Sequence, residues 1–169
     1  VFMTPHTPRY YIDQFQTRGY QKAMDLLAYD GNSDGGYVIP PRTRRFLSIL
    51  LRKKPEISVR RIRRRDLIED AEHIWRLTNI SLANNWGYVP VDRAVMLDMV
   101  KRLKPILDPD AVWFVEDRGV PVGYCLGFPD LNIILKEIDG RLFPAGFLKF
   151  LAQRRRLMSY RLFGLAIHP

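Results

Sequence analysis

Side chains that could do chemistry are few and widely spaced in this 169-residue chain. Its three histidines, His6, His73 and His168, lie far apart and none follows a glycine-flanked serine, so the sequence contains neither a serine-hydrolase motif nor a zinc-ligand spacing. The one cysteine, Cys125, excludes an internal disulfide and lies in an apolar run that predicts a buried thiol. The two candidates for a catalytic base are Glu116, at the end of a predicted strand, and His168.

Basic charge is concentrated in one stretch of the chain. The formal net charge is +9, and eleven basic residues lie between Arg42 and Arg65, where Glu56 is the one acidic residue. This stretch is either a site for phosphate-bearing ligands, RNA or an anionic membrane, or a solvated segment whose arginines pair with nearby carboxylates. An amphipathic helix predicted from Thr43 to Pro55 is too short to bury much apolar area in a membrane, so we expect it to pack on the protein.

Hydrophobic periodicity predicts an α/β (α+β) architecture in which helices flank a sheet. Asp66 and Glu69 have the spacing of a capping box at a helix start. The last strand has almost no polar face, which predicts a central position with both faces covered. Apolar spacing and turn residues place helices at about 11–15, 43–54, 66–82, 92–103, 130–138 and from 147 onward, and strands at 23–29, 57–63, 112–116, 120–128 and 159–168, with the third and fourth strands forming a hairpin.

Several segments, taken in order, resemble the GNAT superfamily of N-acetyltransferases. Residues 59–72 resemble the opening strand and first helix of the family, Pro121-Val122-Gly123-Tyr124 resembles its third strand, and residues 165–169 resemble the end of its fourth strand. Uncharacterised bacterial proteins with two GNAT-like units are similar at three further segments, 81–90, 129–132 and 140–144. The opening segments 10–11, 19–20 and 25–29 are similar to the closing helix and strands of a GNAT unit.

This resemblance implies a partial GNAT-type fold, a mixed and mostly antiparallel sheet flanked by helices and truncated after the fourth strand. Residues 1–30 would be the C-terminal tail of a preceding GNAT-like unit, 31–57 a linker with a short basic helix, and 58–169 the N-terminal part of a GNAT-like acyltransferase domain. The chain begins without Met and ends directly after an apolar run, so we expect it to be a fragment.

The resemblance also implies transfer of an acetyl group from acetyl-CoA to a small-molecule or peptide amine. The backbone of Leu165, Ala166, Ile167 and His168 would bind the acyl-CoA. The pyrophosphate-binding loop of the family would follow Pro169, so we expect the chain to be inactive without the missing C-terminal half of the same protein.

The loop at 84–90 is where the resemblance places acceptor recognition. Asn84, Asn85, Trp86 and Tyr88 are therefore predicted to bind the substrate, although the same aromatic side chains would equally suit a lid over the core.

Two other functions stay open, a non-catalytic basic module for RNA or an anionic membrane surface and a degenerate GNAT unit kept as a scaffold. The single cysteine and the lack of a run of about 20 apolar residues indicate a reducing, cytoplasmic setting, and we expect no metal, no membrane partner and no nucleic acid.

Overall fold

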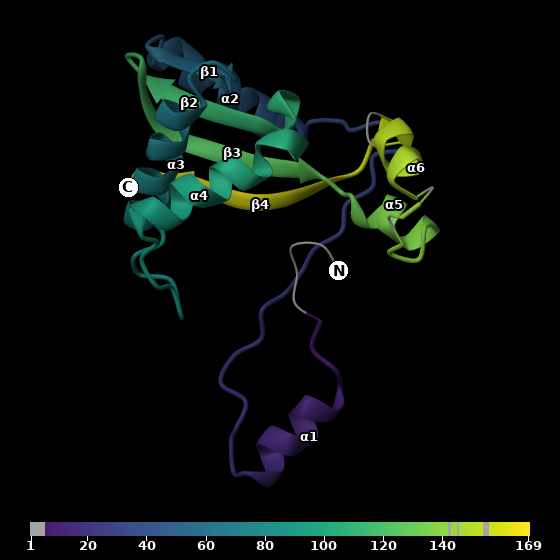
Figure 1. The fold of residues 1–169 in the computed structure, drawn as a ribbon. Helices are drawn as coiled ribbons and strands as arrows, with labels where there is room; N and C mark the ends of the chain where they lie inside the picture. Colours follow the sequence, from purple (N-terminus) through teal and green to yellow (C-terminus); the bar gives the residue numbers. More distant parts are fainter. Residues whose placement is uncertain (1–5, 142, 145, 154–155) are drawn as a thin grey trace. The chain divides into compact units, whose positions relative to one another are not determined.

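The computed structural model describes residues 6–141, 143, 144, 146–153 and 156–169 (Figure 1). By its internal contacts the chain divides into two compact units, Val1–Ser48 and Ile49–Pro169. The three-segment division implied by the resemblance stays a prediction. Leu142, part of the predicted similarity at 140–144, lies outside the described residues.

In the first unit, α1 (Tyr10–Thr17) is a short helix, as the sequence predicted. Gly19 follows it with φ +83°, a left-handed conformation that glycine adopts without strain. The strand predicted at 23–29 is wrong, because no strand forms there and Leu26 and Tyr29 are exposed. A strand needs a partner for its backbone groups, and the described residues of this unit contain no other strand.

A second helix, α2 (Pro41–Lys53), crosses the boundary between the units. It begins at Pro41, whose fixed φ suits the first helical position and whose missing N–H would be unpaired there in any case. None of its residues is buried. The sequence predicted that this helix packs on the protein, but most of its apolar side chains are exposed, Phe46 and Leu51 by more than half.

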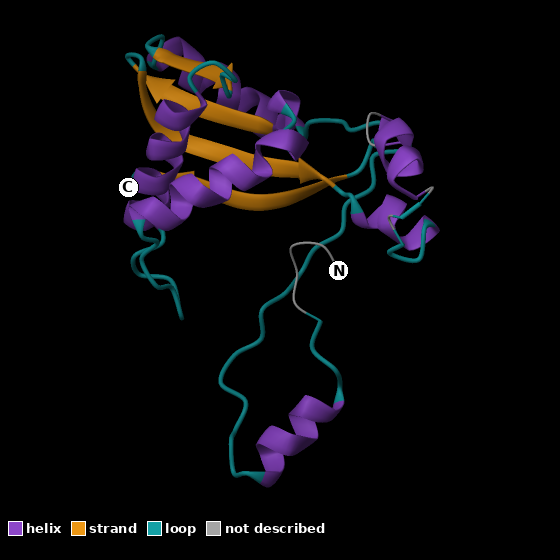
Figure 2. Ribbon diagram, viewed as in Figure 1, coloured by secondary structure: helices purple, strands orange, loops and turns teal. Residues whose placement is uncertain are grey.

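Four strands of the second unit form one antiparallel sheet, which confirms the predicted fold class of a mixed α+β arrangement with helices flanking a sheet (Figure 2). The β2–β3 hairpin is confirmed as well, and Arg118 and Gly119 turn it with φ 51° and 79°. In spatial order the strands are β1 (Ile57–Arg61), β2 (Val112–Asp117), β3 (Val120–Pro129) and β4 (Tyr160–Ile167).

β4 lies at the edge of the sheet, which corrects the prediction of a central strand. Among the described strands it pairs with β3 alone, and Leu162, Leu165 and Ile167 are exposed. An apolar composition indicates that a strand can be buried on both faces, but the position of the strand in the sheet depends on the topology of the chain. In the described sheet the strands neighbour one another in chain order, so β4 lies outermost among them.

Helices α3 (Leu67–Ser81) and α4 (Arg93–Leu103) lie together over one face of the sheet (Figure 2). The predicted capping box is wrong, because the Asp66 side chain makes no capping hydrogen bond to α3. Asp92 instead caps α4 and accepts from the Ala94 amide at 2.7 Å. The connection from β3 to β4 contains α5 (Asn132–Glu137) and α6 (Gly146–Gln153).

The core of the second unit lies between these two helices and the sheet. Leu67, Ala71 and Ile74 are buried, so the predicted apolar face of α3 is confirmed for them. They face Phe114 of β2, which is completely buried, and Met96 of α4 joins them. The packing of α3 on the sheet determines where the C-terminal end of α3 lies relative to β4. That position sets the geometry of the candidate site.

Candidate functional site

The backbone of β4 is open along one side. His168 N donates to Val122 O at 2.7 Å, and this pair continues the β3–β4 register. Hydrogen-bonded and non-bonded pairs alternate in an antiparallel ladder, so Ala166 also directs its N–H and C=O toward β3. Leu165 and Ile167 therefore direct theirs away from the sheet. Of the four predicted backbone positions, these two lie along the open edge.

Ser81 occupies one of these outward groups. Its Oγ donates to Ile167 O at 2.6 Å. Because Ser81 is the last residue of α3, this bond joins the end of that helix, and the start of the loop after it, to the end of β4. The amides of Leu165 and Ile167 have no protein partner among the described residues, so two donors of one strand remain available on the open edge.

Tyr124 fixes the separation between α3 and the sheet beside this edge. Thr78 Oγ1 donates to Ile74 O at 2.6 Å and lies 2.7 Å from Tyr124 Oη. A threonine hydroxyl has one hydrogen, so Tyr124 donates the second bond. Burial raises the pKa of Tyr124, although the bond to Thr78 opposes this, and the phenol stays neutral as a structural donor. A Cβ on Gly164 would lie 3.1 Å from this ring, so a side chain there would require the ring to shift by a few tenths of an ångström.

A side-chain clamp on α3 holds the loop that follows it. Asn79 Nδ2 donates to Val91 O at 3.0 Å, and Asn79 Oδ1 accepts from Val91 N at 2.9 Å, as a neighbouring strand would. Tyr88 Oη donates to the same Asn79 oxygen at 2.5 Å, and Trp75 Nε1 donates to Val91 O at 2.7 Å. The loop is thus anchored at its C-terminal end by the helix that precedes it.

The four predicted substrate-binding residues of this loop separate into two kinds. Tyr88 is half-buried and committed to the clamp, whereas Asn84, Asn85 and Trp86 are exposed, Trp86 by 61%. Trp86 therefore does not cover the core, so the alternative of an aromatic lid does not hold for it. Whether these side chains bind an acceptor stays a prediction.

Glu116, one candidate base, is part of an ion-pair network. Its Oε1 accepts from Arg60 Nε at 2.5 Å. Arg60 also binds Asp70, a fully buried carboxylate of α3, at 2.7 and 3.0 Å. Burial alone would raise the pKa of Asp70, but hydrogen bonds from Arg60 and from the Arg63 amide outweigh it and hold this pKa below its ordinary value. The arrangement ties α3 to β1 and β2, which is a structural role for Glu116.

His168, the other candidate base, lies at the end of β4 and is exposed. Its Nδ1 donates to Pro169 O at 2.9 Å. Glu116 is on β2, two strands away, which corresponds to about 10 Å of sheet. The structure therefore does not bring the two candidate bases together. It brings His168 near the open β4 edge, and the role of His168 as a base stays a prediction.

The structure divides the basic stretch into two parts. From residue 60 onward most of its arginines pair with carboxylates, as the second interpretation expected: Arg61 lies 2.8 Å from Asp110, and Arg63 lies 3.3 Å from Asp66. Arg64 donates to the backbone carbonyl of Leu107 at 2.8 Å. The cations of α2 form no ion pair among the described residues. One stretch in the sequence is thus two different features in the fold.

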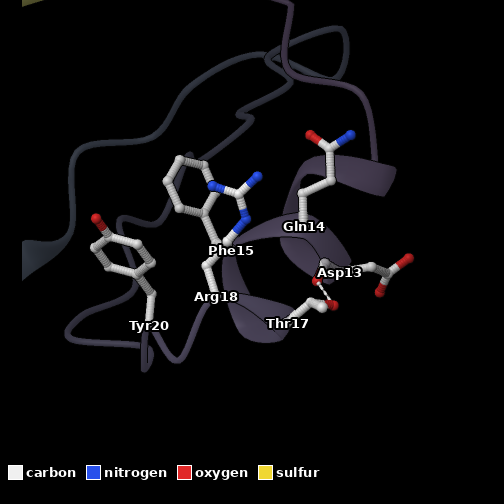
Figure 3. A pocket seen from close by; sticks show the side chains of 6 residues that line it. All are labelled: Asp13, Gln14, Phe15, Thr17, Arg18 and Tyr20. Atoms are coloured by element: carbon white, nitrogen blue, oxygen red, sulfur yellow. Dashed lines mark hydrogen bonds between the residues drawn. The ribbon is translucent and has the colours of Figure 1, made fainter.

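An open hollow of about 590 Å³ lies beside α1. Figure 3 shows the six side chains that line it. Phe15 and Tyr20 meet edge to face with ring centroids 5.4 Å apart, and Thr17 Oγ1 donates to Asp13 O at 2.7 Å. All lining residues come from this one exposed helix and the short segment after it, so the hollow is an open surface along the side of a helix and not an enclosed binding pocket. The walls are Asp13, Gln14, Phe15, Thr17, Arg18 and Tyr20.

Two smaller hollows lie on opposite faces of the sheet. A cavity of about 50 Å³ between α3, α4 and the sheet has apolar walls that include Met96 and Phe128, and it is a gap in core packing. The other, of about 310 Å³, includes Trp113, Cys125 and Tyr160. Cys125 is half-buried, less than the sequence predicted, and burial raises the pKa of its thiol, so it is protonated and a poor nucleophile.

Within the described ranges, no group of three or more His, Cys, Asp or Glu side chains is arranged to hold a metal ion. No helix there is both long and apolar enough to cross a bilayer.

Sequence reasoning missed Ser81 and Asn79. A serine at a helix end carries no signal for a partner 86 residues away. Asn79 had a signal in principle, since a polar side chain four residues after Trp75 on the helix precedes a loop that needs anchoring.

Two curated proteins match the chain. It is 28% identical over 149 residues to protein YghO of Escherichia coli strain K12, an alignment that covers 88% of this chain and 37% of that protein. It is 29% identical over 159 residues to the bacterial ceramide synthase of Caulobacter vibrioides, covering 86% of this chain and 37% of that protein. The chain thus spans 37% of the length of each of these relatives. No family model and no solved structure matches it.

Proposed function

We propose that this chain is part of an acyl-CoA-dependent N-acyltransferase of the GNAT type. One observation carries the proposal, the open edge of β4 where Leu165 and Ile167 direct unpartnered amides away from the sheet. A strand edge offers donors at a regular spacing whatever its side chains, and an extended amide-containing arm such as that of CoA can pair with it as an added strand would.

The reaction needs little from side chains. An amine attacks the thioester carbonyl, a C–N bond forms, and the C–S bond breaks as the thiol departs. Negative charge develops on the carbonyl oxygen in between, and a fixed backbone N–H aimed at that oxygen stabilises it. The hydrogen bond of Ser81 joins α3 to β4, and that of Tyr124 joins α3 to the neighbouring strand β3, so together they support the position of the outward amides of β4.

The relative from Caulobacter supports acyl transfer to nitrogen. It is named a ceramide synthase, and a ceramide contains an amide between a fatty acyl chain and an amine. Acetyl-CoA, which the resemblance implies, is the first donor to test, and a long-chain acyl-CoA with a long-chain amine is the second. Because the chain spans 37% of each relative, the activity is proposed for the whole protein.

The test is a calorimetric titration of acetyl-CoA, and then of a long-chain acyl-CoA, into the whole protein that contains these residues. Leu165→Pro removes one outward amide hydrogen without removing a ladder bond, and Gly164 before it has no Cβ to clash with the new ring. The matched control is Val59→Pro at an equally outward, exposed position of β1, the opposite edge strand.

We expect Leu165→Pro to weaken binding about 3- to 10-fold, the value of one hydrogen bond, and Val59→Pro to bind as the unmodified protein does. Absence of acyl-CoA binding by the whole protein, or equal affinities for all three proteins, would refute the proposal. Thiol release from the acyl-CoA in the presence of an amine then tests turnover.

A further inference from the structure

α2 has a high density of cations without counter-charges. Helix residues 41–53 contain no carboxylate, and none of the helix's cations forms an ion pair in the described part of the chain. This distinguishes them from the arginines at 60–65, most of which are committed to carboxylates. The uncommitted cations are Arg42, Arg44, Arg45, Arg52 and Lys53.

The same helix has an apolar side. At about 100° per residue, four apolar positions fall within an arc of about 140°. Arg45 and Arg52 fall on the opposite side of the helix, and Arg44 flanks the arc next to Leu51. Phe46 is 63% exposed and Leu51 52% exposed, so these apolar side chains keep more than half of their surface in contact with solvent. The four positions are Phe46, Leu47, Leu50 and Leu51.

We propose that α2 is a docking helix for an anionic phospholipid bilayer, lying in the plane of the surface with its apolar arc among the acyl chains and its arginines at the phosphates. Both halves of the helix find a partner there: apolar area leaves water, and cations meet negative charge. RNA would satisfy the arginines alone and leave Phe46 and Leu51 in water. A bilayer is therefore the occupant that fits the charge and the apolar arc together.

This inference does not depend on the acyltransferase proposal, because it concerns a different part of the chain and a different ligand. The length of α2 sets its scale: 13 residues rise about 20 Å, enough to lie on a surface and too short to cross one. The attachment is thus peripheral and sensitive to salt, since charges near an anionic surface are screened within about 10 Å.

The experiment is flotation of the full 169-residue chain with two kinds of vesicle, phosphatidylcholine alone and phosphatidylcholine with phosphatidylglycerol in equal parts. A charge variant carries Arg44→Gln, Arg45→Gln and Arg52→Gln, and an apolar variant carries Phe46→Ser and Leu51→Ser. The matched control, with the same loss of three charges, replaces exposed cations without ion pairs outside α2: Arg76→Gln, Lys101→Gln and Lys104→Gln.

We expect binding to the anionic vesicles alone, weakened about 100-fold in the charge variant, since each cation near an anionic surface contributes about fivefold. The apolar variant should also lose binding, and the control should lose far less. All substituted residues of α2 lie outside the core, so circular dichroism should show unchanged folding.

Three results would overturn the proposal. The first is no binding of the unmodified chain to anionic vesicles. The second is a result that makes the helix a site for phosphate alone. Either full retention of vesicle binding by the apolar variant, or binding of a mixed-sequence RNA oligonucleotide in place of vesicles, would show this. The third is a change in sedimentation of the apolar variant without lipid, which would assign the arc to a second copy of the chain.

Discussion

Proline scanning of β4 gives the sharpest test of the register that exposes its edge. Ala166 directs its N–H toward β3, whereas the neighbouring Leu165 directs its own to the open side. Ala166→Pro removes a ladder bond, about 1 kcal/mol, and leaves a carbonyl of Tyr124 without a donor, about 1–3 kcal/mol more. Adding the ring clash, we expect a loss of about 3 kcal/mol or more. Leu165→Pro loses no ladder bond and should cost less than about 1 kcal/mol.

The assay is chemical denaturation monitored by circular dichroism, which gives the free energy of unfolding of each variant. Ala166→Gly and Leu165→Gly are the controls for side-chain loss, since neither removes an amide hydrogen. If Leu165→Pro destabilises as much as Ala166→Pro, the alternation assigned to β4 is wrong. The acyl-CoA edge would then consist of the other pair of residues, and the site would have to be rebuilt.

Three further predictions concern the supports of the site. The fold lowers the pKa of Asp70, so the stability that this carboxylate contributes is fully present above its unfolded-state pKa of about 4 and is lost as pH falls through its folded-state pKa. Asp70→Asn should therefore lower the free energy of unfolding by about 3–5 kcal/mol at neutral pH and flatten the acid side of a stability-versus-pH curve. Gly164→Ala should cost about 1–3 kcal/mol in thermal unfolding, because its Cβ would press on the Tyr124 ring, and an unchanged melting temperature would contradict that contact. Asn79→Ala should speed amide hydrogen exchange at 88–91 while leaving β3 protected, and equal exchange with the unmodified chain would show that the clamp does not hold the loop.

Local patterns predicted the second unit better than the first. The hairpin turn needs left-handed residues and Arg118-Gly119 supplies them, and the spacing of Leu67, Ala71 and Ile74 marks a helix face whatever lies opposite. The strand predicted at 23–29 does not form, because a strand needs a partner strand and the apolar pattern of one segment does not show whether a partner exists.

The sequence named the segments of the candidate site, but it did not show which contacts support them. The end of β4 and the loop after α3 were both named from the sequence. Ser81 links these two segments through a contact between residues 86 positions apart in the sequence. Asn79 holds the loop from the preceding helix through a contact between residues 12 positions apart.

The sequence by itself determined the elements that local chemistry controls: the helices, the hairpin, the balance of charge outside one basic stretch, and the absence of a metal or hydrolase motif. Only the tertiary structure decided three things, namely that β4 is an edge strand, that two of its amides face outward, and that the basic stretch divides into paired arginines and the free cations of α2. The physical reason is that strand position, hydrogen-bond direction and ion pairing are properties of two segments at once. A residue's own type says which partners it can accept, and packing decides which one it has.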